Sequence, residues 1–148
     1  MAENPFTLEF YRSPDGKEPA RDWMRRRLSV DKRRALAAAL HLILARQGVG
    51  VCATPYGRQL GRGLFEFRLD EDEATLLHKW SPGAMAAGHP TLAGRSVLLR
   101  VFCHATGDRV ILILGGYDKG KSPSPRKQQR EIALARARLK DFKARGLQ

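Results

Sequence analysis

Alternating apolar and polar positions near the N-terminus predict a first β-strand over residues 6–11. Phe6, Leu8 and Phe10 fall on one face of such a strand, and the polar side chains between them fall on the other. Residues 13–16 read Ser-Pro-Asp-Gly, a combination that favours a turn. We therefore expect a short strand that ends in a tight turn.

Apolar positions three and four residues apart follow this turn and predict two helices. We expect a short helix over residues 18–28 and a longer one from the N-cap Ser29 to Gln47. Gly48 stands where a helix-terminating glycine belongs. A tight turn joins the two helices, which predicts an αα-hairpin. The expected buried positions are Trp23, Met24 and Leu28 in the first helix and Leu36, Leu40, Ile43 and Leu44 in the second.

Three further strands are predicted at residues 64–69, 97–104 and 109–116. The last contains a continuously apolar run, which is typical of a central strand covered on both faces. Residues 105–108, Ala-Thr-Gly-Asp, predict a tight hairpin connection. Residues 49–62 carry several glycines and a proline and are interpreted as a loop.

A final helix is predicted after the last strand, with Ser124 as its N-cap and Pro125 at its first position. Its apolar face comprises Ile132, Ala135, Leu139 and Phe142, and its other faces are basic. The resulting order predicts a single α+β domain over residues 1–148. We expect a small, mostly antiparallel sheet on which the N-terminal αα-hairpin and the C-terminal helix pack.

The segment at about 70–96 is too long for an ordinary hairpin connection. It begins with an acidic run at 70–73, continues through an apolar and basic run at 76–80, and ends in a stretch rich in Gly, Ala and Pro. We interpret it as a long β-hairpin insertion followed by a loop.

The chain is strongly basic, with 27 Lys and Arg against 15 Asp and Glu in 148 residues and a formal net charge of +12. Ten of the basic residues lie in 117–148, where three acidic residues oppose them. This balance favours a polyanionic partner, either a nucleic acid, an anionic membrane or an acidic protein. A basic surface without such a partner is the alternative.

Cysteine usage and the N-terminus favour a cytoplasmic protein. Cys52 and Cys103 form neither a Cys-x-x-Cys pair nor a zinc pattern, and two unpaired thiols suit a reducing compartment. The N-terminus lacks the pattern of a secretory signal, and no apolar run reaches the length of a membrane span. We expect no cofactor, no metal site and no membrane partner.

Two arginines interrupt predicted strands, Arg68 and Arg100. An arginine inside a strand is costly to bury unless an anion meets it. If the two strands pair, the two guanidinium groups lie close enough to clamp a phosphate. The alternative is that one of them pairs with Glu66, Asp70 or another carboxylate of the chain.

Five short motifs occur in order along the chain. They are Gly-Lys-Glu-Pro-Ala-Arg-Asp-Trp at 16–23, Gly-Leu-Phe-Glu-Phe-Arg at 63–68, Arg-Val-Phe at 100–102, Tyr-Asp-Lys-Gly-Lys at 117–121 and Glu-Ile-Ala-Leu-Ala at 131–135. Their order and spacing resemble the RelE/ParE superfamily of type II toxin–antitoxin toxins, and in particular its phage-related, HigB-like branch. The resemblance covers most of the chain except 71–96.

This resemblance implies a toxin that binds the ribosomal A site, cuts mRNA there and so inhibits translation. The cut uses the 2′-OH of the RNA as nucleophile and needs no metal. The resemblance also implies a cognate antitoxin, expected to be of the helix-turn-helix type. The toxin is then either a homodimer or part of a toxin–antitoxin hetero-oligomer.

Five residues are expected to do the chemistry. Arg68 and Arg100 would stabilise the charge on the phosphorane, and Lys119 would transfer a proton or stabilise charge. Tyr117 would stack on a base or supply its hydroxyl, and Asp118 would orient a cation or act as base. The alternative for the turn at 117–121 is a well-capped turn with exposed charges.

Further basic residues are expected to contact the RNA backbone, and one histidine is a candidate acid or base. None of the four histidines falls in the matched turn, and His104, at the end of a predicted strand, is the one considered for proton transfer. The predicted RNA-binding residues are Lys79, Lys121, Arg126, Lys127 and Arg130.

Two other functions stay open at this point. The same fold would suit a non-catalytic toxin that inhibits a DNA topoisomerase or translation. A basic module that binds RNA or the ribosome without cutting would share the same charge pattern.

Overall fold

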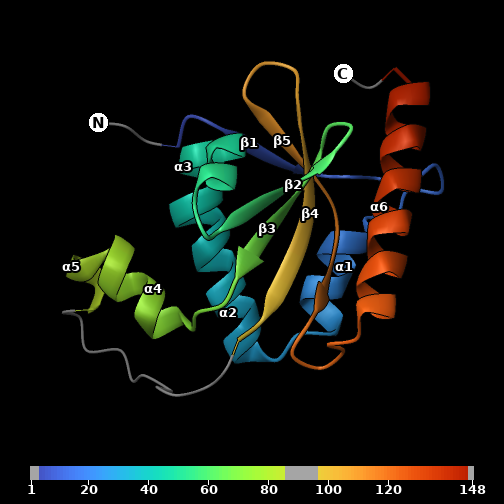
Figure 1. Cartoon of the computed structure of the whole chain (residues 1–148). Coiled ribbons are helices and arrows are strands. Elements are labelled where there is room, and N and C mark those ends of the chain that lie inside the picture. Colours follow the sequence, from blue (N-terminus) through green and yellow to red (C-terminus); the bar gives the residue numbers. More distant parts are fainter. Residues whose placement is uncertain (1–3, 86–96, 147–148) are drawn as a thin grey trace.

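The structure, a computed structural model, describes residues 4–85 and 97–146, and these residues contain a five-stranded sheet (Figure 1). The strands lie in the order β1-β5-β4-β3-β2. β1 runs parallel to β5, and the other neighbours are antiparallel. The α+β class is therefore confirmed, with a mixed sheet. The strand bounds are Thr7–Phe10 (β1), Gly57–Gly61 (β2), Leu64–Leu69 (β3), Leu99–Thr106 (β4) and Val110–Asp118 (β5).

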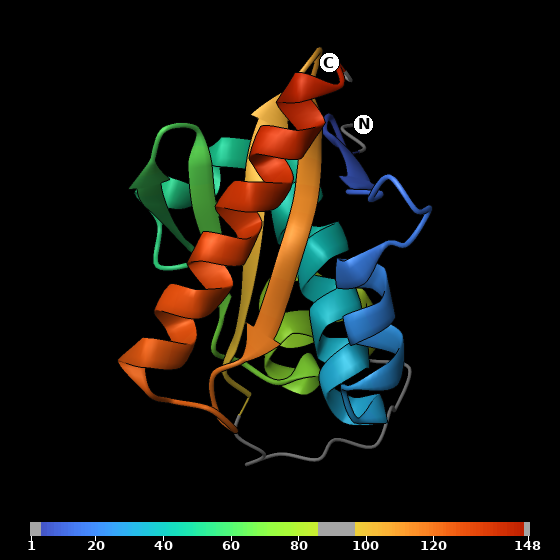
Figure 2. The same ribbon diagram turned by 90° about the vertical axis from the view of Figure 1, so that its right-hand side faces the viewer.

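Helices pack on both faces of the sheet (Figure 2). On one face, α1 (Pro19–Arg26) and α2 (Val30–Ala39) form the larger hydrophobic core together with side chains of β3, β4 and β5. α2 continues into the π-helical turn η1 (Leu40–Leu44) and then α3 (Ala45–Gln47). On the other face, α6 (Pro125–Ala144) covers a smaller core. The apolar run of β5 is thus buried on both sides, as its sequence predicted.

Side-chain caps confirm the predicted starts of two helices. The hydroxyl of Ser29 accepts a hydrogen bond from the backbone N–H of Lys32, and that of Ser124 accepts one from Lys127. Each cap satisfies a backbone donor that the first helical turn leaves without a partner. Gly48 has a φ of 56°, so the chain leaves the helical path at the predicted glycine.

A β-bulge interrupts the pairing of β4 with β5. Phe102 lies opposite Gly115 and Cys103 lies opposite Ile113, which leaves Leu114 as an extra residue on β5. The guanidinium of Arg138, on α6, donates a hydrogen bond of 2.9 Å to the carbonyl of Leu114. The carbonyl of the extra residue is therefore satisfied by a side chain from another element.

The interpretation of residues 49–62 as a loop is wrong. A 3-10 helix, η2 (Gly48–Ala53), is followed by the edge strand β2, which pairs with β3 up to an irregularity near Gly61. β2 reads Gly-Arg-Gln-Leu-Gly, and this sequence has no apolar alternation. This segment forms a strand because it pairs with the edge of β3. That tertiary contact is not visible in the local sequence pattern.

The interpretation of residues 70–96 as a β-hairpin insertion is also wrong for the residues described. The structure has two helices there, α4 (Glu73–Trp80) and α5 (Pro82–Met85), and residues 86–96 lie outside the described part. Asp72 caps α4 by accepting a hydrogen bond from the backbone N–H of Thr75. The acidic run is therefore a helix start, which favours negative charge.

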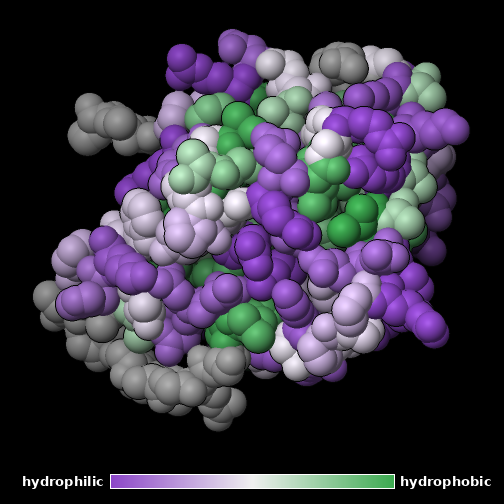
Figure 3. All heavy atoms as spheres, in the orientation of Figure 1, coloured by the Kyte–Doolittle hydropathy of each residue, from purple (hydrophilic) through white to green (hydrophobic). Residues whose placement is uncertain are grey.

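The expectation that no apolar run reaches the length of a membrane span is wrong by composition, because the helical stretch Val30–Ala53 is long and apolar enough, with a mean hydropathy of 1.5 in its most apolar window. In the structure, Leu36, Ile43 and Leu44 are fully buried in the larger core. This burial is typical of the core helix of a globular fold, so the stretch is weak support for a membrane span. On the face shown in Figure 3, hydrophilic side chains cover most of the surface and separate the hydrophobic areas from one another.

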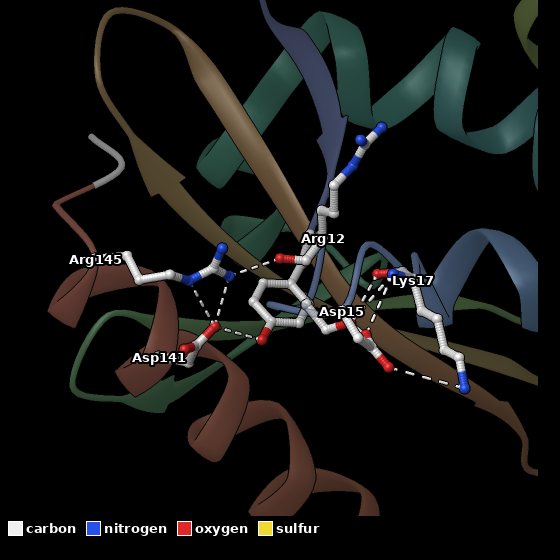
Figure 4. A network of polar contacts seen from close by, with 7 residues as sticks. Arg12, Asp15, Lys17, Asp141 and Arg145 are labelled. Atoms are coloured by element: carbon white, nitrogen blue, oxygen red, sulfur yellow. Dashed lines mark hydrogen bonds and ion pairs between the residues drawn. The ribbon is translucent and has the colours of Figure 1, made fainter.

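A polar network holds the C-terminal half of α6 against the chain that leaves β1 (Figure 4). The hydroxyl of Tyr11 donates to Asp141 over 2.6 Å, and Arg145 bridges from Asp141 to the carbonyl of Arg12. Apolar packing of α6 involves its later turns, through Ala135, Leu139 and Phe142. Near the start of α6, Gln128 instead donates a hydrogen bond to the buried carboxylate of Glu66 on β3.

Candidate functional site

Three of the predicted site residues lie in one row across three neighbouring strands. Arg68 of β3 is directly opposite Arg100 of β4, and Arg100 is directly opposite Tyr117 of β5. Leu64 and Tyr117 belong to the smaller core beneath α6. Because side chains alternate along a strand, Glu66 and Arg68 point to the same face as Leu64. The two arginine-bearing strands do pair, which is the condition for the two guanidinium groups to lie close together.

The Arg100 side chain is buried, with 2% of its surface exposed. Its Nη1 donates to Asp70 Oδ1 over 2.6 Å and to the carbonyl of Leu99 over 2.9 Å, while its Nε has no partner. Asp70 is half exposed. The alternative in which an arginine pairs with Asp70 is therefore found in this structure.

Glu66 is a second buried charge, with no exposed surface. Gln128 of α6 donates a hydrogen bond of 3.0 Å to its Oε2. Its Oε1 lies 3.5 Å from Arg58 Nε and 3.7 Å from Arg68 Nε, close enough for ion pairing but without a hydrogen bond. Glu66 therefore holds two guanidinium groups near one buried carboxylate.

Tyr117 presents a buried hydroxyl that has no hydrogen-bond partner. Its ring stacks on Phe102 with a centroid distance of 6.2 Å and an interplanar angle of 6°. Burial raises the pKa of the hydroxyl, the charge of Glu66 raises it further, and Arg100 partly offsets both effects. The hydroxyl therefore stays protonated at neutral pH and is a donor without an acceptor.

Buried polar atoms without hydrogen bonds concentrate around Glu66, Arg68, Arg100 and Tyr117. Among the described residues, six buried side-chain N or O atoms lack a hydrogen bond, and four of them belong to Glu66, Arg68, Arg100 and Tyr117. Such atoms are rare in folded proteins because each costs about 1–3 kcal/mol. Their concentration on one sheet face marks this face as the candidate site.

The prediction of a turn over 117–121 is wrong for its first two residues, because Tyr117 and Asp118 are the last residues of β5. Asp118 holds together the turn that follows. Its Oδ2 accepts an ion pair of 2.6 Å from Lys32 of α2, and its Oδ1 accepts a hydrogen bond from the backbone N–H of Lys121. The backbone N–H of Lys119 donates to the carbonyl of Leu98. These contacts fit the alternative of a capped turn, and the catalytic roles of Lys119 and Asp118 stay predictions.

Cations collect beside this turn, in a cleft of about 590 Å³ between α1, the end of β5 and α6. In Figure 2, the end of β5 lies between α6 and the α1–α2 pair. Lys121 and Lys127 line the cleft as residues predicted to bind RNA, and Lys127 also pairs with Glu131 at 2.9 Å. Arg126 and Arg130 are exposed on α6 nearby. Three further cations of the cleft were missed by the sequence interpretation: Arg26, Arg27 and Arg138.

The structure does not bring His104 to the other site residues. His104 Nδ1 lies 2.7 Å from the carbonyl of Gly63, and His104 lies opposite Leu112. It is four residues from Arg100 along one strand, which separates the two by on the order of 13 Å. A role for His104 in proton transfer at the arginine cluster, which comprises Arg58, Arg68 and Arg100, is therefore not supported.

Lys79 lies on α4, beside the arginine cluster. It pairs with Glu71, and this hydrogen bond raises the pKa of its ammonium group. Glu71 also accepts a hydrogen bond of 2.8 Å from the hydroxyl of Tyr56. Lys79 lines a cavity of about 200 Å³ together with Tyr56, Arg68, Asp70 and Glu71.

Arg58 and Gln128 were missed because of two different errors. Arg58 belongs to β2, which the sequence pattern did not reveal, and only the pairing of Arg58 with Glu66 across β2 and β3 places it here. Gln128 lies on a helix face considered basic, and it reaches Glu66 across 62 residues of chain. No local signal in the sequence connects these residues.

The described residues contain no group of three or more His, Cys, Asp or Glu side chains that would hold a metal ion. The site therefore offers guanidinium groups, one buried carboxylate and one phenol.

A scan against models of known protein families gave no match for this chain, and a comparison with curated proteins gave none either.

Proposed function

We propose that this protein is a metal-independent endoribonuclease, acting as a RelE/HigB-like toxin on mRNA at the ribosome. The observation that carries the proposal is the cluster of buried polar atoms without hydrogen bonds on Glu66, Arg68, Arg100 and Tyr117. A folded protein retains such costly groups where a ligand or a reaction uses them. Arginine is suited to phosphate because its planar fork binds two oxygens at once.

The cluster contains the groups that 2′-OH attack requires. In the proposed reaction, which requires the buried carboxylate of Glu66 to become accessible to the RNA, Glu66 accepts the proton of the 2′-OH. The 2′ oxygen then forms a bond to phosphorus. Arg58, Arg68 and Arg100 stabilise the charge of the phosphorane. As the bond from phosphorus to the 5′ oxygen breaks, the Tyr117 hydroxyl gives its proton to that oxygen. The products are a 2′,3′-cyclic phosphate and a 5′-hydroxyl.

Basic residues around the cluster supply the sequence-independent part of RNA binding. Lys121, Arg126, Lys127 and Arg130 lie at the turn after β5 and on the first turns of α6. Contacts of lysine and arginine to the RNA backbone position the chain without reading bases. By its resemblance to the toxin family, the proposal includes a cytoplasmic location and a silencing antitoxin of the helix-turn-helix type.

Binding without cleavage is the second candidate function. Arg100 and Tyr117 are both nearly fully buried, which favours a structural role for them in this conformation. A toxin that blocks translation by occupying the ribosome would use the same cationic surface. The two candidates differ in one observable, the appearance of new RNA ends.

The deciding experiment is induced expression followed by mapping of mRNA 5′ ends. Wild type is compared with Arg68→Ala and Tyr117→Phe, and Arg46→Ala serves as a charge-matched control because Arg46 is exposed on α3. The proposal expects in-frame cuts for wild type and the control and their loss in both site variants. Growth arrest without cuts would select the binding function instead.

A further inference from the structure

Arg100 and Asp70 form an ion pair whose two partners have very different environments. The Arg100 side chain is 2% exposed, whereas that of Asp70 is 50% exposed, and the two are 2.6 Å apart. Arg100 therefore depends on a carboxylate that water reaches. Asp70 directly follows β3 and precedes the cap of α4, so it lies in a connection between two elements.

Asp70 also lines the cavity of about 200 Å³ beside α4. Two cations, Arg68 and Lys79, line the same cavity together with a second carboxylate, Glu71, which pairs with Lys79. Arg68 lies directly opposite Arg100 across β3 and β4. Asp70 thus connects the buried guanidinium of Arg100, which does not itself line the cavity, to a cavity lined by two cations and by Glu71.

A carboxylate and a phosphate are both oxyanions, and a guanidinium binds either in the same geometry. A buried cation needs an anion, because an unpaired buried charge is strongly destabilising. Asp70 supplies that anion when the cavity holds no ligand. A ligand phosphate in the cavity would meet Arg68 as well as Lys79, where it would compete with the Glu71 carboxylate. The released carboxylate of Asp70 would regain its hydration.

We propose that this cavity binds an RNA phosphate and that the phosphate replaces Asp70 as the ion-pair partner of Arg100. Asp70 is then a competing internal anion that keeps the guanidinium paired in the free protein and lowers the affinity for RNA. The inference rests on the proposed function for the identity of the polyanion. It also gives a reason why Arg100 is buried and paired in this structure.

The test compares Asp70→Asn with a matched control, Glu73→Gln, which removes one negative charge from the same segment. Glu73 pairs with Arg34 on the surface, away from Arg100. Binding of a 2′-O-methylated RNA oligonucleotide is measured by fluorescence anisotropy, so that cleavage plays no part. D70N is expected to bind about fivefold more tightly than E73Q, which is the size expected when an ion pair with one exposed partner is removed.

A second measurement covers the case in which D70N is unstable. Without its carboxylate, Arg100 lacks an anion, so D70N should melt at a lower temperature than wild type. Inorganic phosphate should then raise the melting temperature of D70N by more than that of wild type or E73Q, because a ligand stabilises the state that it binds. Equal phosphate effects in all three proteins, or an affinity of D70N no higher than that of E73Q, would overturn the proposal.

The two proposals fail separately. If wild type cuts no mRNA but D70N binds the oligonucleotide more tightly than E73Q, the phosphate-binding cavity is supported and the nuclease function is overturned. If wild type cuts mRNA and D70N shows no gain, the internal competition is wrong and the nuclease activity stands.

Discussion

Arg138 of α6 donates a 2.9 Å hydrogen bond to the carbonyl of Leu114, the extra residue of the β5 bulge. Burial lowers the pKa of this guanidinium, with a partly compensating effect of Glu131. Gly115 leaves the space that Arg138 occupies, because a Cβ there would lie 2.7 Å from Arg138 Nη1. The irregularity of the sheet and the position of α6 are therefore coupled through one side chain.

Replacing Arg138 by methionine should lower the free energy of unfolding by about 1–3 kcal/mol. The change leaves the buried carbonyl of Leu114 without its donor while keeping most of the apolar side-chain volume. Urea denaturation measures the effect. Arg130→Met, at an exposed position of the same helix, serves as the control and should change stability by about 0.5 kcal/mol or less. Equal stabilities of the two variants would contradict this assignment.

Gly116→Ala should destabilise the fold more than an ordinary glycine substitution. A Cβ at position 116 would lie 2.5 Å from the ring of Trp23 and 2.9 Å from the carbonyl of Arg100, so the ring or the backbone must move. Overpacking of this kind typically costs about 1–3 kcal/mol. Gly83→Ala is the control, because nothing lies within 4 Å of a Cβ there. Thermal unfolding of both variants gives the comparison, and a destabilisation confined to Gly83→Ala would refute it.

The stability contributed by the polar network that holds α6 to the chain after β1 should depend on pH through Asp141 and Tyr11 (Figure 4). Hydrogen bonds from Tyr11 and Arg145 hold the pKa of Asp141 below its ordinary 3.8. A carboxylate whose pKa is lowered in the folded state contributes stability above its unfolded pKa, and this stability is lost as the pH falls through the folded value. Burial, followed by the hydrogen bond to Asp141, raises the pKa of Tyr11 above 10, so its contribution is lost in strong alkali.

Tyr11→Phe should therefore lower the melting temperature between about pH 4 and pH 10, the interval bounded by these two ordinary pKa values. The difference from wild type should shrink below this interval, where Asp141 becomes protonated, and above it, where Tyr11 ionises. Melting curves across the pH range measure it. A constant difference in melting temperature down to pH 2 would show that the hydrogen bond from Tyr11 to Asp141 does not stabilise the contact of α6.

Tyr117→Phe should separate stability from activity. The Tyr117 hydroxyl is buried without a partner, so its removal should leave the free energy of unfolding unchanged or raise it by up to about 1 kcal/mol. RNA cleavage should fall at least about 100-fold, because the proton donor is lost. Tyr56→Phe gives the contrast, since that hydroxyl bonds to Glu71 and Trp80 and its loss should destabilise. Full cleavage by Tyr117→Phe would remove this hydroxyl from the mechanism.

Glu66→Gln should abolish cleavage while RNA binding persists. Glutamine keeps the shape and retains an oxygen for the hydrogen bond from Gln128, but it does not take up the proton of a 2′-OH. Loss of a negative charge between Arg58 and Arg68 should also tighten binding of the 2′-O-methylated oligonucleotide. Cleavage kinetics and anisotropy on the same preparation measure both effects, and undiminished cleavage would exclude Glu66 as the base.

Local patterns identified the elements that local physics controls. Ser29 and Ser124 cap helices as predicted, and β3, β4 and β5 form near the predicted positions, because capping and apolar periodicity act within a few residues. β2 was missed, and the segment at 70–85 was given the wrong type. β2 is a strand through its partner, and the acidic run at the start of α4 was not interpreted as a cap.

The sequence by itself determined the charge of the protein, the mixed α and β order of its elements and the placement of Arg68 and Arg100 on strands. Only the tertiary structure decided which charges meet. Asp70 reaches Arg100 across 30 residues of chain, and Gln128 reaches Glu66 across 62. Such pairings depend on strand register and on how α6 lies over the sheet, and these are set by packing of the whole domain.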